Sequence, residues 1–171
     1  MVQLMRAEKE ILKAVPVRRR SAARLAAVQI TYQSLITGQS ALNFVHQFLA
    51  NYADDVAKSF KVKHLDEAHL TALYAGVENN MEAIDSAIAA QLVDGWSLDR
   101  LTRIELSVLR CGTYEIQSML DIPVRAAVSE YAALSDACGC DVAFVNAVLD
   151  QLARAARIVE MDKQRERSRL D

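Results

Sequence analysis

Apolar residues recur every three or four positions from Leu25 to Val159, and this spacing constrains the fold more than any other feature of the sequence. A period near 3.6 residues places such side chains on one face of a helix. The 171 residues include five Gly and two Pro, which provide few of the turns that an all-β fold needs. Hydrophobic residues make up 52% of the chain, enough to bury a substantial core. We therefore predict an all-α fold of about six to seven helices in two small packed bundles.

Capping and breaking residues divide this pattern into segments. The expected N-caps are Ser21, Ser40, Asp66, Ser97 and Asp141. Gly38 is expected to end the first helix. The predicted helices cover about residues 21–37, 40–56, 66–92, 97–116, 124–138 and 141–159. The length favours one domain at residues 18–160, with a flexible extension at 1–17 and a charged, frayed tail at 161–171.

Charge is distributed unevenly along the chain, although the formal net charge is only −2. Residues 1–24 contain seven Lys/Arg and two Glu, whereas residues 25–160 contain nine Lys/Arg and 17 Asp/Glu. A basic segment ahead of an acidic body predicts two different partners. One is a polyanion at the basic end, and the other is a cationic protein on the body.

Arg18, Arg19, Arg20 and Arg24 form the densest part of the basic segment, at the start of the first predicted helix. Positive charge at that end opposes the helix dipole, so we expect it to serve an external anion. The phosphates of a nucleic acid suit the planar donors of arginine. A basic tail in solvent is the alternative that this feature alone leaves open.

The sequence lacks the motifs of common catalytic and metal sites. Its glycines form no phosphate loop, dinucleotide fingerprint or nucleophile elbow. The paired carboxylates have no accompanying base or nucleophile. The histidines and cysteines, which are the usual zinc ligands, do not have the spacing of a metal site; they are His46, His64, His69, Cys111, Cys138 and Cys140. We therefore expect no enzyme activity, no metal and no cofactor.

The same features predict a reducing, cytoplasmic setting. Residues 1–17 are charged throughout and lack the apolar core of a secretory leader, and the cysteines are odd in number. Residues 25–53 contain no Asp, Glu, Lys or Arg, but polar residues and Gly38 interrupt the run. That pattern favours two amphipathic helices over a membrane span.

Five segments, in order, resemble the bacterial transcription antitermination factors of the NusB family. In residues 18–32 the arginine cluster leads into Ala-Arg-Leu-Ala-Ala-Val-Gln-Ile-Thr-Tyr, and residues 144–150 read Phe-Val-Asn-Ala-Val-Leu-Asp. The other segments are residues 74–80, 96–115 and 122–130. The resemblance covers about residues 18–154.

The resemblance implies a fold of two three-helix bundles that binds the single-stranded boxA RNA of ribosomal operon leaders and catalyses nothing. It also implies a heterodimer with NusE, a basic protein of the small ribosomal subunit. Other Nus factors and RNA polymerase would be contacted indirectly, so that polymerase reads through terminators in rRNA genes. Self-association of the free protein is compatible with this interpretation.

Together with side-chain chemistry, the resemblance predicts eight residues that contact RNA. The family match places Arg20 and Arg24 at basic positions of the RNA-binding motif, with Arg18 and Arg19 beside them. The others are Gln29 for a base edge, Tyr32 for stacking, and Phe144 and Asn146 at the start of the last predicted helix. Core packing is the alternative for Tyr32 and Phe144.

Four residues on the acidic body match positions that meet NusE in the family. They are Asp99, Glu105, Tyr114 and Glu115. A solvated helix face is the alternative, and Asp99 also suits the first turn of a helix after Ser97. Arg103 and Arg110 could instead neutralise these carboxylates within the chain.

Two departures from the family pattern affect these assignments. Ser21, Ala22 and Ala23 split the arginine run, which shifts basic contacts toward Arg18 and Arg19. Ala147 replaces the glycine that follows asparagine in the last motif, and its Cβ would hold RNA farther from the backbone. Two other hypotheses remain: an adaptor that delivers an rRNA-modifying enzyme, and a helical interaction module without RNA affinity.

Overall fold

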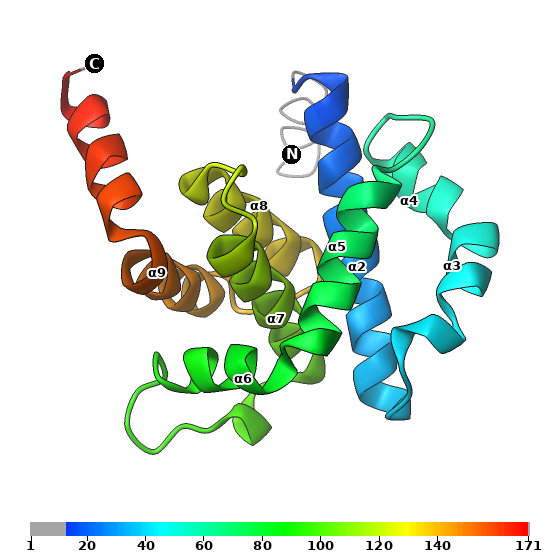
Figure 1. The fold of residues 1–171 in the computed structure, drawn as a ribbon, viewed down its shortest axis with the longest axis horizontal. Helices are drawn as coiled ribbons and strands as arrows, with labels where there is room; N and C mark the ends of the chain where they lie inside the picture. Colours follow the sequence, from blue (N-terminus) through cyan, green and yellow to red (C-terminus); the bar gives the residue numbers. More distant parts are fainter. Residues whose placement is uncertain (1–12, 171) are drawn as a thin grey trace. The chain divides into compact units, whose positions relative to one another are not determined.

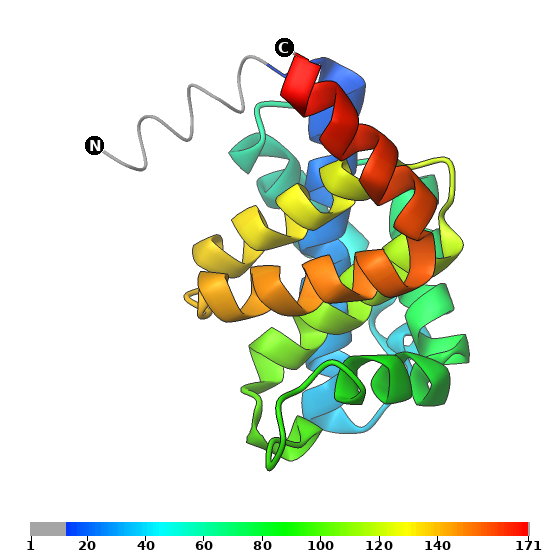
Figure 2. The same cartoon turned by 90° about the vertical axis from the view of Figure 1, so that its left-hand side faces the viewer.

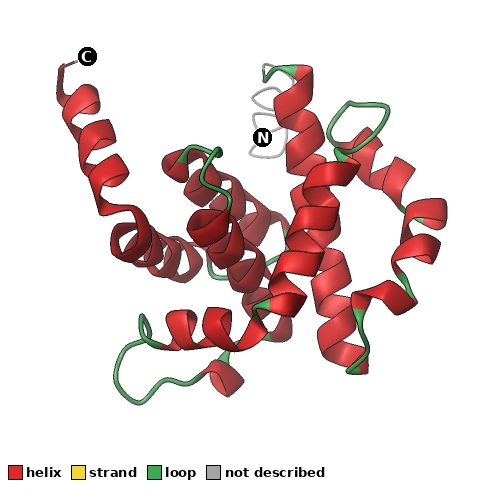
Figure 3. Ribbon diagram, viewed as in Figure 1, coloured by secondary structure: helices red, strands yellow, loops and turns green. Residues whose placement is uncertain are grey.

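The computed structural model describes residues 13–170, and all regular structure within this range is helical (Figure 3). This part of the chain contains eight α-helices and two short 3-10 helices. The predicted all-α fold is therefore confirmed. Two compact units make up the chain, Met1–Glu78 and Asn79–Asp171. Most of the predicted extension, residues 1–12, lies outside the described residues.

The first unit is built around one long helix (Figure 1). Its elements are α2 (Val15–Thr37), η1 (Ala41–Asn43), α3 (Val45–Asn51), α4 (Ala53–Ser59) and α5 (Glu67–Asn79), whose last residue passes the unit boundary. The alanines of α2 are buried and small, so a neighbouring helix can approach closely, and α4 packs against α2. Larger buried side chains of this unit include Ile30, Val45, Phe48, Val56, Leu70 and Leu73.

Several predicted boundaries of the first unit agree with the structure. Gly38 ends α2 in the left-handed conformation, with φ of 69°. The hydroxyl of Ser40 accepts a hydrogen bond from the Leu42 amide at 3.3 Å. The carboxylate of Asp66 accepts one from the His69 amide at 3.0 Å. These residues act locally, which is why sequence alone identifies them.

Two predicted helices are interrupted. The expected helix at 40–56 is divided into η1, α3 and α4, because Phe44 and Tyr52 have φ near −130° (−137° and −127°). The expected helix at 66–92 breaks at Asn80, with φ of −124°, between α5 and α6 (Met81–Ala89). Two consecutive asparagines precede Met81, and their side chains compete with helical hydrogen bonds.

The second unit is a helical bundle. Its elements are α6, η2 (Leu98–Arg100), α7 (Arg103–Ser118), α8 (Val124–Ala137) and α9 (Val142–Leu170). Helices α7, α8 and α9 pack against one another, and α6 packs against α7. Gly112 of α7 permits this close packing, because a Cβ there would lie 2.8 Å from Leu149 Cδ2. The carboxylate of Asp141 accepts a hydrogen bond from the Phe144 amide at 3.1 Å, as its predicted capping role requires.

A kink divides α9 at Arg157, where φ is −140° and ψ is 46°. Figure 2 shows the last part of α9 (red) running in a different direction from its first part (orange). Arg157 Nη1 donates to the Ile122 carbonyl oxygen at 2.9 Å, and Glu160 Oε1 accepts from the Val124 amide at 2.8 Å. The tail predicted to be frayed is helical to Leu170, and its Lys, Arg, Gln and Glu residues are good helix formers.

Candidate nucleic-acid interface

The arginine cluster lies inside α2 and not ahead of it. The helix begins at Val15 with Pro16 in its first turn, a position that proline favours, so residues 18–20 occupy its first two turns. No acidic residue lies in this first turn to offset the charge. The predicted N-cap Ser21 is wrong: it is buried, and its hydroxyl donates to the carbonyl oxygen of Val17 at 3.1 Å. Serine commonly makes this bond inside a helix.

Two guanidinium groups hold the loop between α4 and α5 against α2. Arg18 Nη1 donates to the carbonyl oxygen of Lys61 at 2.5 Å. Arg19 Nε donates to the carbonyl oxygen of His64 at 3.1 Å. Carbonyl oxygens are neutral acceptors, so both arginines keep their full charge at this end of α2.

Arg20 and Arg24 differ in exposure. Arg20 is half-buried, and its guanidinium has no hydrogen bond or ion pair with any residue in the described part of the chain. The Arg24 side chain is 2% exposed. An RNA contact by Arg24 would therefore require its side chain to leave this position, whereas Arg20 needs no such change.

Gln29 and Tyr32 lie on the exposed side of α2. Gln29 is exposed, and 39% of Tyr32 is accessible to solvent. A separation of three residues places the two side chains on neighbouring turns of one helix face. The alternative of core packing for Tyr32 is therefore wrong, and its ring is available for stacking.

In the second unit, Phe144 lies next to an aromatic residue that was not among the predicted contacts. The Phe144 and Trp96 rings have centroids 6.2 Å apart and are tilted by 35°. Trp96 is 48% exposed, whereas Phe144 is half-buried. The sequence held a signal that could have identified Trp96. It is the only tryptophan and directly follows Gly95 in a turn, where a large ring is expected to stay exposed to solvent.

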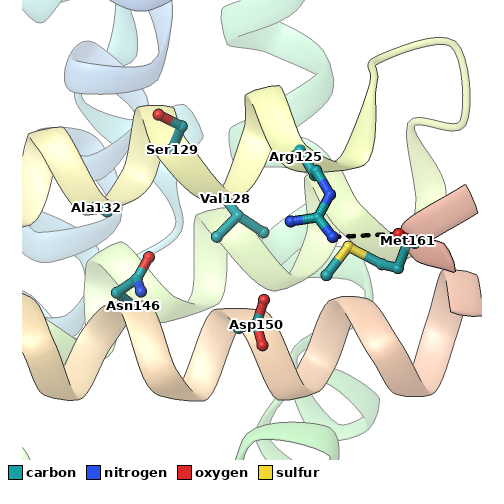
Figure 4. A pocket seen from close by; sticks show the side chains of 7 residues that line it. All are labelled: Arg125, Val128, Ser129, Ala132, Asn146, Asp150 and Met161. Atoms are coloured by element: carbon teal, nitrogen blue, oxygen red, sulfur yellow. Dashed lines mark hydrogen bonds between the residues drawn. The ribbon is translucent and has the colours of Figure 1, made fainter. Parts of the chain in front are cut away.

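Asn146 is exposed at a shallow pocket between α8 and α9 (Figure 4). The residues that line it are Arg125, Val128, Ser129, Ala132, Asn146, Asp150 and Met161. Arg125 donates to the Met161 carbonyl oxygen at 3.1 Å. Asp150 pairs with Arg154 at 3.0 Å. The charged groups at this pocket thus have partners within the chain, and Asn146 supplies a side-chain amide without a hydrogen-bond partner among residues 13–170.

Asp99 is exposed and Glu105 is half-buried, and both make local hydrogen bonds. The Asp99 carboxylate accepts a hydrogen bond from the Ser97 hydroxyl, and this bond lowers the pKa of Asp99. Glu105 Oε2 accepts from the Thr102 amide at 3.3 Å, while Thr102 Oγ1 accepts from the Glu105 amide at 3.2 Å. This reciprocal pair is a capping box that starts α7. The helix predicted to begin after Ser97 therefore begins at Arg103.

Tyr114 and Glu115 lie farther along α7 and differ from each other in burial. Tyr114 is half-buried, whereas Glu115 has no exposed surface. Glu115 Oε2 accepts a hydrogen bond from the Tyr131 hydroxyl at 2.5 Å. Glu115 therefore joins α7 to α8, and a partner protein could reach it only if this contact opened.

Arg110 does not neutralise the acidic residues of its own helix. Its Nε and Nη2 donate to the two carboxylate oxygens of Asp85, each at 2.9 Å. This bidentate pair joins α7 to α6. Arg103 is exposed and has no ion pair with any residue from 13 to 170. Asp99 and Glu105 thus remain without an ion-pair partner among these residues.

Two thiols of this unit, Cys138 and Cys140, have raised pKa values. Burial raises the pKa of Cys138, and burial together with the nearby Cys138 and Glu105 raises that of Cys140 to about 11. Both are therefore protonated near neutral pH. Within residues 13–170, no three His, Cys, Asp or Glu side chains are placed to hold a metal ion.

A sequence model of the NusB family matches residues 21–154, which is more than half of the chain. The chain belongs to the NusB family. Its relatives are named as transcription antitermination proteins, so the family is one of regulatory factors and not of enzymes. The matched span begins directly after residues 18–20, and it ends before the kink in α9.

Known NusB proteins resemble this chain over most of their length. The transcription antitermination protein NusB of Sphingopyxis alaskensis is 35% identical over 140 residues, which cover 81% of this chain and 94% of the relative. That of Nitrobacter hamburgensis is 38% identical over 144 residues, which cover 83% and 90%.

A solved structure of T. maritima NusB shares the fold. It has a TM-score of 0.64 and 23% identity, over 84% of this chain and 96% of that one. The similarity confirms the predicted NusB-like helical architecture. None of the helices between residues 13 and 170 has the length and apolarity needed to span a bilayer.

Proposed function

We propose that this NusB-family chain binds the single-stranded boxA RNA of ribosomal operon leaders and acts in the cytoplasm as a heterodimer with NusE. In this role it helps to assemble the antitermination complex on RNA polymerase. The main support comes from α2, where Arg20 has no partner among residues 13–170 and precedes the exposed Gln29 and Tyr32 on the same helix. Such a helix carries side chains suited to phosphate, base-edge and stacking contacts.

The chemistry of these side chains suits single-stranded RNA. Arg20 offers planar donors to a phosphate, and its neighbours Arg18 and Arg19 add charge. Gln29 can hydrogen-bond a base edge, and Tyr32 can stack on a base face. In the second unit, Phe144 with Trp96 offers a further stacking surface, and Asn146 offers an amide.

The proposed NusE contact uses the accessible acidic residues. Asp99 and Glu105 have no ion-pair partner in the described range and would meet a cationic protein. Tyr114 is half-buried and would contribute from the edge of this surface. Glu115 is buried, so we assign it a supporting role through its bond to Tyr131.

The experiment is a titration of labelled boxA RNA and a scrambled control, with and without NusE, at several salt concentrations. The wild-type chain should prefer boxA, and its affinity should fall with salt. Arg20→Gln should reduce the log–log salt slope by about 0.7, the value for one phosphate contact to a single strand. Arg165→Gln is the matched control, because it removes the same charge from an exposed site far along the chain.

Equal slopes for the two variants would remove Arg20 from the interface. Absence of RNA binding even with NusE present would overturn the proposed function and favour a helical module that contacts only proteins. Recovery of an rRNA-modifying enzyme in place of NusE would instead favour the adaptor hypothesis.

A further inference from the structure

Three lysines form a second cluster of positive charge in the first unit. Lys58 lies in the last turn of α4, and Lys61 and Lys63 lie in the loop that leads to α5. All three side chains are exposed, and none has an ion-pair partner among residues 13–170. We refer to these three residues as the lysine loop.

Arginines of α2 fix the lysine loop beside the arginine cluster. Arg18 Nη1 donates to the carbonyl oxygens of both Phe60 (3.2 Å) and Lys61 (2.5 Å). Lys61 itself has φ of 57°, a left-handed conformation that is uncommon for lysine. The loop backbone at Phe60 and Lys61 is therefore held next to the Arg18 guanidinium.

This arrangement affects which basic side chains can donate hydrogen bonds to an external phosphate. Arg18 and Arg19 donate hydrogen bonds to carbonyl oxygens of the loop, so fewer of their N–H groups are available to an external phosphate. The three exposed lysines of the adjoining segment carry ammonium groups with three donors each. Two arginines thus position a loop that supplies new donors.

Nearby carboxylates do not pair with the lysine loop. Asp54 and Asp55 lie in the first turn of α4, and neither forms an ion pair with Lys58. Asp66 uses its carboxylate to cap α5. Glu67 is exposed at the start of α5 and also lacks an ion-pair partner in the described part of the chain. The ammonium groups are therefore available to an outside anion.

We propose that the lysine loop is a second phosphate-binding segment, which extends the contact with the RNA backbone beyond the arginine cluster. This inference rests on the proposed RNA-binding function. Lysine presents a point charge and not a planar fork, so the lysine loop adds affinity without adding preference for a base sequence. Its ligand is the sugar-phosphate backbone of single-stranded RNA.

The test compares the salt dependence of RNA binding for four variants of the full chain. Lys58→Gln/Lys61→Gln/Lys63→Gln should lower the log–log slope by about 2, at 0.7 per contact. Between 50 and 200 mM salt, the wild type should then lose about 20-fold more affinity than this variant. Lys163→Gln/Arg165→Gln/Arg167→Gln is the control with the same charge change, and replacement of the three loop lysines by arginine should retain binding.

Loss of affinity should be equal for boxA and scrambled RNA. The variant Lys58→Gln/Lys63→Gln leaves the backbone-constrained Lys61 intact and should lower the slope by about 1.4, which separates a phosphate role from a folding effect. Slopes equal to the C-terminal control would overturn the lysine-loop proposal, while an Arg20→Gln effect would still support RNA binding by α2. Wild-type protein without RNA affinity would overturn both.

Discussion

At the scale of single residues, a buried hydrogen bond joins α8 to α7 in the second unit. The Tyr131 hydroxyl lies 2.5 Å from Glu115 Oε2, and neither residue has exposed surface. A buried carboxyl oxygen that loses its donor cannot recover a hydrogen bond from water, so such a contact is costly to break. We therefore assign this pair to stability and not to partner binding.

Tyr131→Phe should lower the free energy of unfolding by about 0.5–1.5 kcal/mol, because it removes one buried hydrogen bond to Glu115. Chemical denaturation followed by circular dichroism measures this change. Tyr52→Phe is the matched control, since Tyr52 is 57% exposed, and it should change stability by less than about 0.5 kcal/mol. Equal effects of the two substitutions would show that the buried bond contributes nothing.

At the scale of an element, α7 is defined by its capping box. Thr102 Oγ1 and Glu105 Oε2 each accept a hydrogen bond from the backbone amide of the other residue. Ser97 was the predicted cap, but it precedes the short helix η2 and makes no capping bond. The first turn of α7 thus depends on Thr102. Glu105 also caps this turn, and its side chain is half-buried.

Thr102→Ala should cost about 1 kcal/mol of unfolding free energy, the usual effect of removing an N-cap. Ser97→Ala should cost less, because Ser97 bonds the exposed Asp99 carboxylate and no backbone amide of a helix. Thermal or denaturant unfolding of both variants checks the order. A larger loss for Ser97→Ala would place the functional start of this helix at η2.

At the scale of the whole molecule, the charge of the chain is divided between a basic segment and an acidic body. Each sign of charge attracts a different class of partner over distances of about a Debye length. The chain belongs to the NusB family, whose members are named transcription antitermination proteins. This membership supports a role in assembling a complex and not in catalysis. The proposed RNA and NusE contacts use opposite charges, so each partner is directed to its own surface.

The double variant Asp99→Asn/Glu105→Gln should slow association with NusE by about 3- to 10-fold at low salt, and the difference should vanish near 1 M salt. Both substitutions keep a hydrogen-bond acceptor, so the local bonds of Ser97 and Thr102 survive. Stopped-flow association measures the rates. Asp54→Asn/Asp55→Asn is the control with the same charge change in the first unit, and an equal effect there would argue against a specific acidic site.

Sequence was sufficient where local chemistry decided the structure. Gly38 ends α2 and Asp141 caps α9, because each acts on backbone groups within four residues. Sequence was insufficient for the break at Asn80. The apolar pattern continues through this residue and predicted one helix, whereas the structure has two. Sequence also placed a helix start at Ser21, because the earlier start at Val15 lies outside the apolar pattern.

The sequence by itself determined the helical class, the family and the division of charge, since these depend on residue types and short spacings. Tertiary structure decided which charged groups are free to bind. Arg18 and Lys61 meet through a bond between residues 43 positions apart, and the buried Glu115 is bonded to Tyr131 of the next helix. Such contacts between distant segments leave no periodic pattern, so exposure and pairing follow only from the fold.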